Sequence, residues 1–334
     1  MAQLANSHPT LLDVAKRVDP NGQIATIVEL LTQKNEILED AVWLEGNLPT
    51  GHRTSVRTGL PTPTWRKMYG FVQPTKSTTA QVTDNCGMLE AYAEVDKAIA
   101  DLNGNTAAFR MSEDSAHVEG MNQEFAETLI YGNEGTEPEA FTGLGPRYNS
   151  LSAENGQNII DAAGDSDRTS IWLVVWSPNT VHAIYPKGSK AGLTMTDKGV
   201  VTVESLGNGV ASAGRMEAYR THYRWDCGLS VRDWRYVVRI ANIDQAALTK
   251  NAGSGADLID LMTDALERVQ DLTSGRPVFY VNRTVRSYLR RQIANKVSNS
   301  TLTMDTVAGK KVMSFDGVPV RRVDKIAVGE GAVA

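Results

Sequence analysis

Alternating apolar and polar positions mark several strands along the chain. The clearest pattern covers residues 216–243, where aromatic side chains gather on one face and charged side chains on the other. Strands of this length, at about 3.3 Å per residue, can cross a whole molecule. Residues 88–95 alternate in the same way, and the unbroken apolar run Ile171–Trp176 predicts a strand buried on both faces.

A long helix is predicted from Ala107 to Tyr131. Within it only Gly120 is a poor helix former, and Gly132 supplies a stop signal. About 25 residues at 1.5 Å each give a rod of roughly 37 Å, which is long for a globular protein. Its polar face is acidic and carries Glu113, Asp114, Glu119, Glu124 and Glu127 against Arg110.

A segment without any acidic residue precedes this helix. Gly46–Thr83 spans 38 residues with no Asp or Glu, few apolar side chains and several prolines. Ordering a residue costs about 1–2 kcal/mol, so we expect an extended arm that becomes ordered on another molecule. We predict a long hairpin with ragged strands near Trp65–Val72 and Ala80–Asp84. Its basic residues are Arg53, Arg57, Arg66, Lys67 and Lys76.

The two ends of the chain carry further signals. A helix is predicted to open at Asp19, and the last third has an α/β pattern. An amphipathic helix is predicted from Leu258 to Gly275, and a strand leads to Asn282, which would cap the next helix. The dipeptide Asp316-Gly317 lies between two apolar runs, which is a strong hairpin signal.

Composition excludes several classes of protein. The chain has 334 residues, 41% of them hydrophobic, and a net charge of −5, which disfavours a DNA-coating accessory protein. Cys86 and Cys227 are the only cysteines, which fits a reducing cytosol. No apolar run reaches the roughly 20 residues of a membrane span. The five histidines lack metal-ligand spacing, so we interpret them as isolated and expect no metal, cofactor or catalytic residues.

Several motifs in order resemble the major capsid proteins of tailed bacteriophages, which have the Hong Kong 97-type fold. They begin with the arm, the hairpin and the long helix, and continue with the loop from Tyr131 to Leu144. The remaining motifs are Trp225-Asp-Cys-Gly-Leu229, Trp234 to Asn242, Asn282 to Leu289, and Phe315 to Ile326. The set covers nearly the whole chain, and the sequence looks closest to capsid proteins of short-tailed phages of the Bordetella phage type.

The resemblance implies an α+β Hong Kong 97-like capsid fold divided into named regions. An N-terminal arm (1–45) and an extended E-loop (46–83) would lead into a peripheral P-domain. The P-domain would comprise 84–150 with the spine helix and 191–243 with the long strands. The axial A-domain, of α/β type, would comprise 151–190 and 244–334.

The resemblance also implies function and partners. The chain would assemble with copies of itself into pentamers and hexamers of an icosahedral shell, the virion capsid, around double-stranded DNA bound without sequence specificity. Assembly would take place in the cytoplasm of the host bacterium. A separate scaffolding protein is expected because no large scaffolding region precedes the arm, and a portal and a cement or decoration protein are further expected partners. Lys76 is a candidate for covalent cross-linking, but no partner asparagine or catalytic acid is identifiable, so we expect non-covalent assembly.

Two other readings remain open at this point. One is a shell protein of an encapsulin-like bacterial compartment, and the other is a soluble α/β enzyme with an unrecognised site. Complementary charge adds a hypothesis of its own to the capsid reading: the basic arm residues of one subunit would lie along Glu113, Glu119, Glu124 and Glu127 of the next. Each exposed pair contributes only about 0–1 kcal/mol, but many copies could together set the register of the contact.

Overall fold

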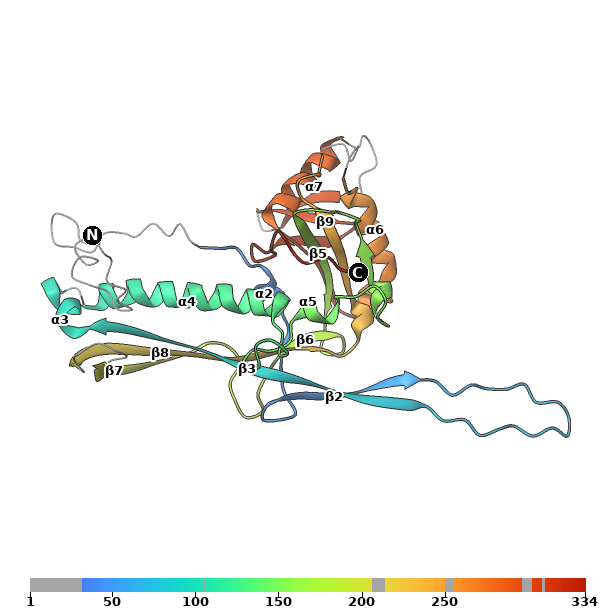
Figure 1. The fold of residues 1–334 in the computed structure, drawn as a ribbon, viewed down its shortest axis with the longest axis horizontal. Coiled ribbons are helices and arrows are strands. Elements are labelled where there is room, and N and C mark those ends of the chain that lie inside the picture. The colour runs from blue at the N-terminus through green and yellow to red at the C-terminus, as the bar shows by residue number, and fades with distance from the viewer. Residues whose placement is uncertain (1–31, 105, 206–213, 250–254, 296–301, 308–309) are drawn as a thin grey trace. The chain divides into compact units, whose positions relative to one another are not determined.

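The computed structural model describes residues 32–334 except 105, 206–213, 250–254, 296–301 and 308–309 (Figure 1). The helix expected at Asp19 lies outside the described residues. The chain divides into two compact units, which are described separately here. The first unit comprises Met1–Gln33, Met88–Phe125 and Gly192–Asp226, and the second comprises Lys34–Gly87, Ala126–Ala191 and Cys227–Ala334. The strands come in runs, such as β4 to β9, and most neighbouring pairs are antiparallel, as is typical of the α+β class.

The second unit is built around strand β5 (Arg168–Trp176). It runs antiparallel to β9 (Val237–Asp244) and β10 (Arg276–Val281), and β10 runs parallel to β13 (Val318–Arg322). Every β5 residue after Arg168 is buried, which accounts for its unbroken apolar run. The other strands of this unit are β1 (Trp43–Glu45), β2 (Gly51–Gly59), β4 (Ile159–Asp161), β6 (Val181–Tyr185), β11 (Leu302–Val307) and β12 (Lys310–Phe315).

Helices α6 (Leu258–Arg268) and α7 (Arg283–Asn295) pack against this sheet (Figure 1). In α6 the buried residues recur at steps of three and four, and they join the β5, β9 and β10 side chains in one core cluster. Asn282 caps α7 as predicted, because its Oδ1 accepts a hydrogen bond from Val285 N at 2.8 Å. The prediction that α6 continues to Gly275 was wrong: the helix ends at Arg268, and a 3-10 turn over Leu272–Ser274 follows, held by the Asp271 side chain.

In the first unit a long helix packs on long strands. Helix α4 (Thr106–Tyr131) confirms the predicted helix to within one residue. Strand β7 (Thr194–Ser205) pairs antiparallel with β8 (Gly214–Val231), and β8 neighbours β3 (Thr78–Asp96). Side chains of α4, β3 and β8 form two small core clusters, and the rings of Phe125 and Trp225 lie 4.5 Å apart. In the part of the chain that the structure describes, the other short α-helices are α2 (Ile37–Asp40), α3 (Lys97–Ala100) and α5 (Leu144–Arg147).

A hairpin is present in the arm, but its strands differ from the prediction. β2 pairs antiparallel with the first part of β3, and the ladder closes at Gly59 and Thr78. Residues 60–77 contain no strand, so the strand predicted over Trp65–Val72 was wrong. Prolines on both sides of that segment remove ladder donors, and residues 80–84 pair with β2 instead.

Glycine residues allow the turn between β12 and β13 and the turn after α4. The Asp316-Gly317 hairpin is confirmed: both residues have positive φ, 49° and 79°, as a type I′ turn between β12 and β13 requires. Gly132 follows the last residue of α4, and a side chain would not fit there, because a Cβ would lie 2.5 Å from the Phe141 carbonyl oxygen. Among the described residues, no helix is long and apolar enough to cross a membrane.

Candidate assembly surfaces

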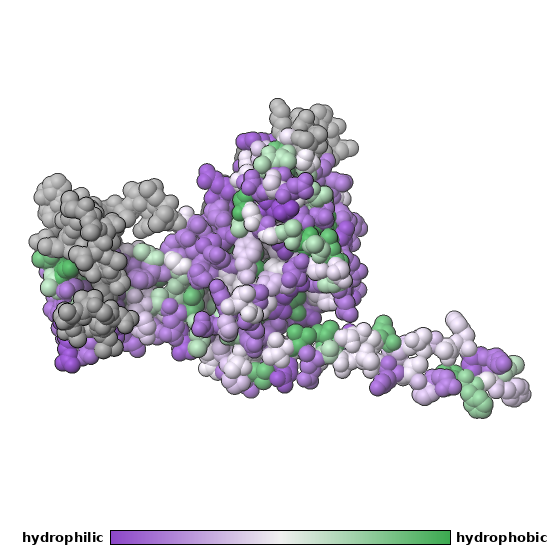
Figure 2. Space-filling view, in the orientation of Figure 1, coloured by the Kyte–Doolittle hydropathy of each residue, from purple (hydrophilic) through white to green (hydrophobic). Residues whose placement is uncertain are grey.

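The loop of residues 60–77 exposes large apolar side chains. Trp65, Tyr69 and Phe71 are 105%, 100% and 98% exposed, and Leu60 and Met68 are exposed beside them. Figure 2 shows hydrophobic and hydrophilic residues interspersed along this extended segment. A monomeric soluble protein rarely leaves such a cluster uncovered, and uncovered clusters mark surfaces that bind a partner.

The five basic residues predicted to contact a neighbour all lie on this hairpin. Arg53 and Arg57 belong to β2, and the loop carries Arg66, Lys67 and Lys76. All five side chains are exposed, and in the described part of the chain none of them forms an ion pair. Arg53 Nε donates to Thr83 Oγ1 at 3.2 Å, across the ladder. The hairpin thus offers positive charge together with apolar surface.

Asp84 anchors the base of the hairpin to the rest of the second unit. Its carboxylate lies 2.8 Å from the Arg147 guanidinium and accepts a hydrogen bond from Ser230 Oγ at 2.7 Å. Asn47 adds two backbone bonds to Arg53, each of 2.7 Å. The base of the hairpin is held by hydrogen bonds and an ion pair, whereas the loop of residues 60–77 is exposed. This arrangement is expected of an arm that contacts another molecule.

Two histidines that the sequence left isolated meet at this base. The rings of His52 and His182 lie 5.6 Å apart, edge to face. His182 is fully buried, and neither of its ring nitrogens has a hydrogen-bond partner. Burial lowers the pKa of His182 to about 4, and the charge of Arg232 acts in the same direction. Burial also lowers the pKa of His52, so both rings are neutral at pH 7.

The four acidic residues predicted on the partner surface all lie on α4, but not all are available. Glu127 is 2.6 Å from Lys325 Nζ, and Glu119 accepts hydrogen bonds from Gln33 N at 3.0 Å and from Gln123 Nε2 at 2.8 Å. Glu113 is half-buried and Glu124 is exposed. Their proposed contact with the arm stays a prediction.

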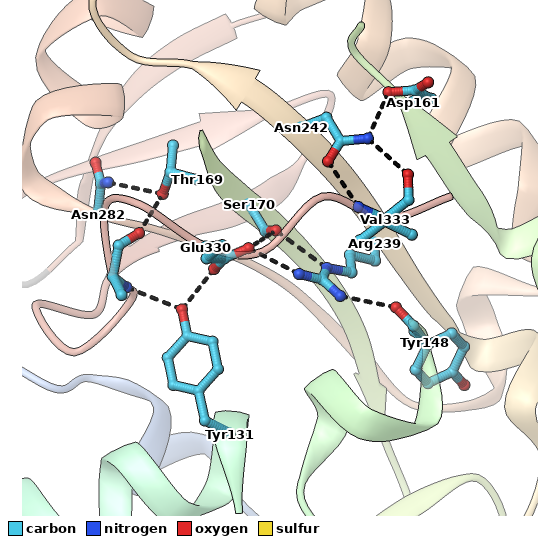
Figure 3. A network of polar contacts seen from close by, with 11 residues as sticks. Tyr131, Tyr148, Asp161, Thr169, Ser170, Arg239, Asn242, Asn282, Glu330 and Val333 are labelled. Atoms are coloured by element: carbon cyan, nitrogen blue, oxygen red, sulfur yellow. Dashed lines mark hydrogen bonds and ion pairs between the residues drawn. The ribbon is translucent and has the colours of Figure 1, made fainter. Parts of the chain in front are cut away.

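A buried polar network, missed at the sequence level, holds the C-terminal segment (Figure 3). Arg239 lies 2.7 Å from Glu330, with both side chains at most 6% exposed. Arg239 also donates to Ser170 Oγ at 3.0 Å and to the Tyr148 carbonyl at 2.8 Å. Tyr131, at the end of α4, donates to Glu330 at 2.5 Å, and burial raises the pKa of its hydroxyl.

The same segment continues past this network. Asn242 Nδ2 donates to the Val333 carbonyl at 2.9 Å, and Val333 N donates to Asn242 Oδ1 at 3.0 Å. The Ser170 hydroxyl donates to Glu330 and accepts from Arg239, and Ser170 is fully buried, so these groups satisfy one another as a structural network. A cavity of about 430 Å³ lies beside it, lined by small and apolar residues with Tyr131, Arg239 and Glu330. Among the described residues, no three His, Cys, Asp or Glu side chains are arranged to hold a metal ion.

Comparisons with known proteins identify a family and solved structures that this chain resembles. The sequence profile of the family "Major capsid protein GP7" matches residues 19–334. A solved capsid structure of bacteriophage Epsilon15 is 41% identical and has a TM-score of 0.76. That match covers 100% of this chain and 99% of the phage chain. A comparison with curated protein sequences finds no match.

More remote solved structures are similar at low identity. The capsid of bacteriophage JBD30 is 10% identical at a TM-score of 0.43, covering 89% of this chain and 92% of that one. The SrpI encapsulin of Synechococcus elongatus is 13% identical at a TM-score of 0.39, covering 71% and 97%. Both similarities are too low to support an argument about this chain, so the encapsulin hypothesis gains no support from them.

The profile match and the Epsilon15 likeness together settle the family and, with it, the Hong Kong 97-like fold. A Bordetella-phage relative stays a prediction. The family is one of structural proteins rather than enzymes, so the enzyme reading is set aside. The chain belongs to the family of the major capsid protein GP7 and is a shell-forming capsid protein of a tailed phage.

Proposed function

We propose that this chain assembles into pentamers and hexamers of an icosahedral shell that encloses double-stranded DNA. The observation that carries the proposal is the loop of residues 60–77, whose large apolar side chains are almost fully exposed. Burying them against neighbouring copies would supply a favourable hydrophobic term at each of many identical contacts. The net charge of −5 suits a container, because a strongly cationic lining would bind the genome tightly.

Each region of the chain has a role in the proposed shell. The E-loop (46–83) lies across a neighbouring subunit, and the N-terminal arm (1–45) precedes it. The P-domain comprises 84–150 and 191–243, with α4 as its spine. The A-domain comprises 151–190 and 244–334, with its loops at the five- and sixfold axes. The continuity of α4 over 26 residues and of β3 over 19 supports an elongated P-domain.

Further partners follow from the same proposal. A separate scaffolding protein would control assembly, because subunits with uncovered loops of this kind are prone to associate wrongly. A portal and a cement or decoration protein stay predictions from the family resemblance. The subunit contacts are proposed to be non-covalent.

Electron microscopy and sedimentation of the expressed chain test the proposal. The chain would be produced alone and together with a candidate scaffolding protein encoded by the same phage. Closed polyhedral particles of one or two discrete sizes are expected. Small discrete oligomers under every condition would overturn it.

A further inference from the structure

A shallow pocket lies on the first unit between α4 and β3. Its volume is about 320 Å³, at the small end for sites that hold a ligand group. Small side chains hollow it out, and Met121 and Leu89 give it apolar walls. The lining residues are Leu89, Ala91, Ala116, His117, Gly120, Met121 and Glu124.

Gly120 is the unexplained residue of this pocket. A glycine within a helix costs about 1 kcal/mol relative to alanine. Its φ is not positive, and a Cβ built on it would meet no atom within 4 Å. The described part of this subunit therefore gives neither a conformational nor a steric reason for a glycine here. Close approach of a group from outside the subunit would supply that reason.

The loop of residues 60–77 carries the groups that fit. Trp65 is fully exposed, and it is followed by the cations Arg66 and Lys67. The pocket offers an apolar floor with Glu124 at its edge, on a helix whose polar face is acidic. Since the loop contains no acidic residue, nothing on it would repel that face. An aromatic side chain followed by two cations matches an apolar hollow with one carboxylate, Glu124, in its lining.

The subunit's own loop cannot reach this pocket. β3 is one uninterrupted strand from Thr78 to Asp96, and Leu89 lies 11 residues beyond Thr78. At about 3.3 Å per residue, that separation is roughly 36 Å along the strand. Trp65 is six residues from Gly59, the residue paired with Thr78, and at most about 3.6 Å per residue allows it roughly 22 Å. A 60–77 loop that fills this pocket must therefore belong to a second copy.

We propose that the pocket over Gly120 seats Trp65 from the 60–77 loop of a neighbouring copy, with Arg66 or Lys67 placed against Glu124. This proposal rests on the proposed function and names the contact that the E-loop makes. Trp65 is the anchor, and the surrounding charges orient it. Because Gly120 has no side chain, it leaves room for the indole ring on the surface of α4.

Filling the pocket tests this directly. Leucine is a better helix former than glycine, so Gly120→Leu is expected to keep or raise the thermal unfolding midpoint of the unassembled subunit. It is expected to lower particle yield by about tenfold or more, as Trp65→Ala should. Ala108→Leu, at an exposed position on the same helix, is the matched control and should assemble normally. Normal particle yield from Gly120→Leu would overturn the proposal.

A disulfide trap gives an independent readout. Copies with Trp65→Cys are mixed with copies with Ala116→Cys, assembled, and oxidised. Covalent dimers of one copy of each kind are expected, whereas neither single variant alone should give them. Particles that form without this cross-link would overturn the pocket contact and leave the shell proposal standing, whereas failure of the unaltered chain to form any particle would count against the shell itself. Disulfide capture of the Ala116→Cys copy by a different protein of the particle would also overturn the contact.

Discussion

Arg239 illustrates how much a single buried residue can hold in this subunit. Its guanidinium bonds to a carboxylate, a hydroxyl and a carbonyl, and it lies 5.0 Å from the centre of the Trp172 ring. Glu330, its acidic partner, is four residues before Ala334. A buried charge that loses its partner is strongly destabilising, so the fixed position of the C-terminal segment depends on this pair.

Removing one partner of this pair should therefore cost more than removing both. We expect Glu330→Ala to lower the free energy of unfolding by about 3–5 kcal/mol. The double variant Arg239→Met with Glu330→Leu should recover a large part of that loss, because no unpaired charge remains. Urea denaturation of unassembled subunits measures both. Equal losses from the single and the double variant would show that the ion pair is not what holds the segment.

A second residue-scale prediction concerns His182 and pH. Its folded-state pKa of about 4 lies below the value of about 6.5 in an unfolded chain. Between these values the unfolded state binds more protons, so stability falls as the pH drops from about 6.5 to about 4. The full loss is on the order of 3 kcal/mol. Besides His52, Asp84 and Arg232 are the charged groups that act on this pair.

The variant His182→Leu isolates this effect. It removes the titrating ring while keeping an apolar side chain, so its stability should depend less on pH over the same window. Urea midpoints of both proteins at pH 7.5, 6 and 5 give the comparison. Parallel pH profiles for the two proteins would rule out His182 as the source.

At the scale of elements, the hairpin and α4 carry the charge pattern that suggested their contact. Glu124 is exposed on α4 and lines the pocket beside Gly120, so it is the acidic residue on which the contact with the arm is tested. We expect Arg66→Glu with Lys67→Glu to reduce particle yield, with the deficit growing at low salt because surface charge is screened at high salt. Glu124→Lys in the same chain should restore part of the yield, whereas Glu127→Lys should restore less. Sedimentation measures the particle yield of each variant. Normal assembly of the chain with the charge-reversed arm would show that the charges of Arg66 and Lys67 do not contribute to the contact.

The elements that the sequence predicted correctly are those that local chemistry determines. The run Ile171–Trp176 is apolar because side chains on both faces of β5 are buried. Asp316-Gly317 forms a turn because these two residue types tolerate the positive φ that the turn requires. The Trp65–Val72 strand was wrong because a strand needs a partner as well as a propensity, and the partner of residues 80–84 is β2.

The parts of the candidate surfaces that were missed depend on contacts between distant residues. Glu330 meets Tyr131 across 199 positions and Arg239 across 91, separations that no local pattern encodes. The pairing of His52 with His182 depends likewise on strand order. By contrast, the absence of acidic residues from Gly46–Thr83 was visible in the sequence, and it pointed to the arm before its exposure was known.

At the scale of the whole molecule, a single subunit leaves an apolar surface uncovered. Its core clusters are closed, and its polar network is satisfied within the second unit, yet the loop of residues 60–77 leaves its largest apolar side chains in water. Replacing residues 60–77 by a two-residue Asn-Gly turn should therefore leave the fold intact and abolish closed particles. Circular dichroism and electron microscopy together separate folding from assembly here. Normal shells from this shortened chain would show that the loop is dispensable.

An electron cryomicroscopy reconstruction of the assembled particle tests the central claim most directly. The account predicts ordered density for residues 60–77 on an adjacent subunit, with the Trp65 side chain against α4 near Gly120. Density for the loop packed on its own subunit, or a well-resolved shell in which this loop touches no other copy, would contradict it.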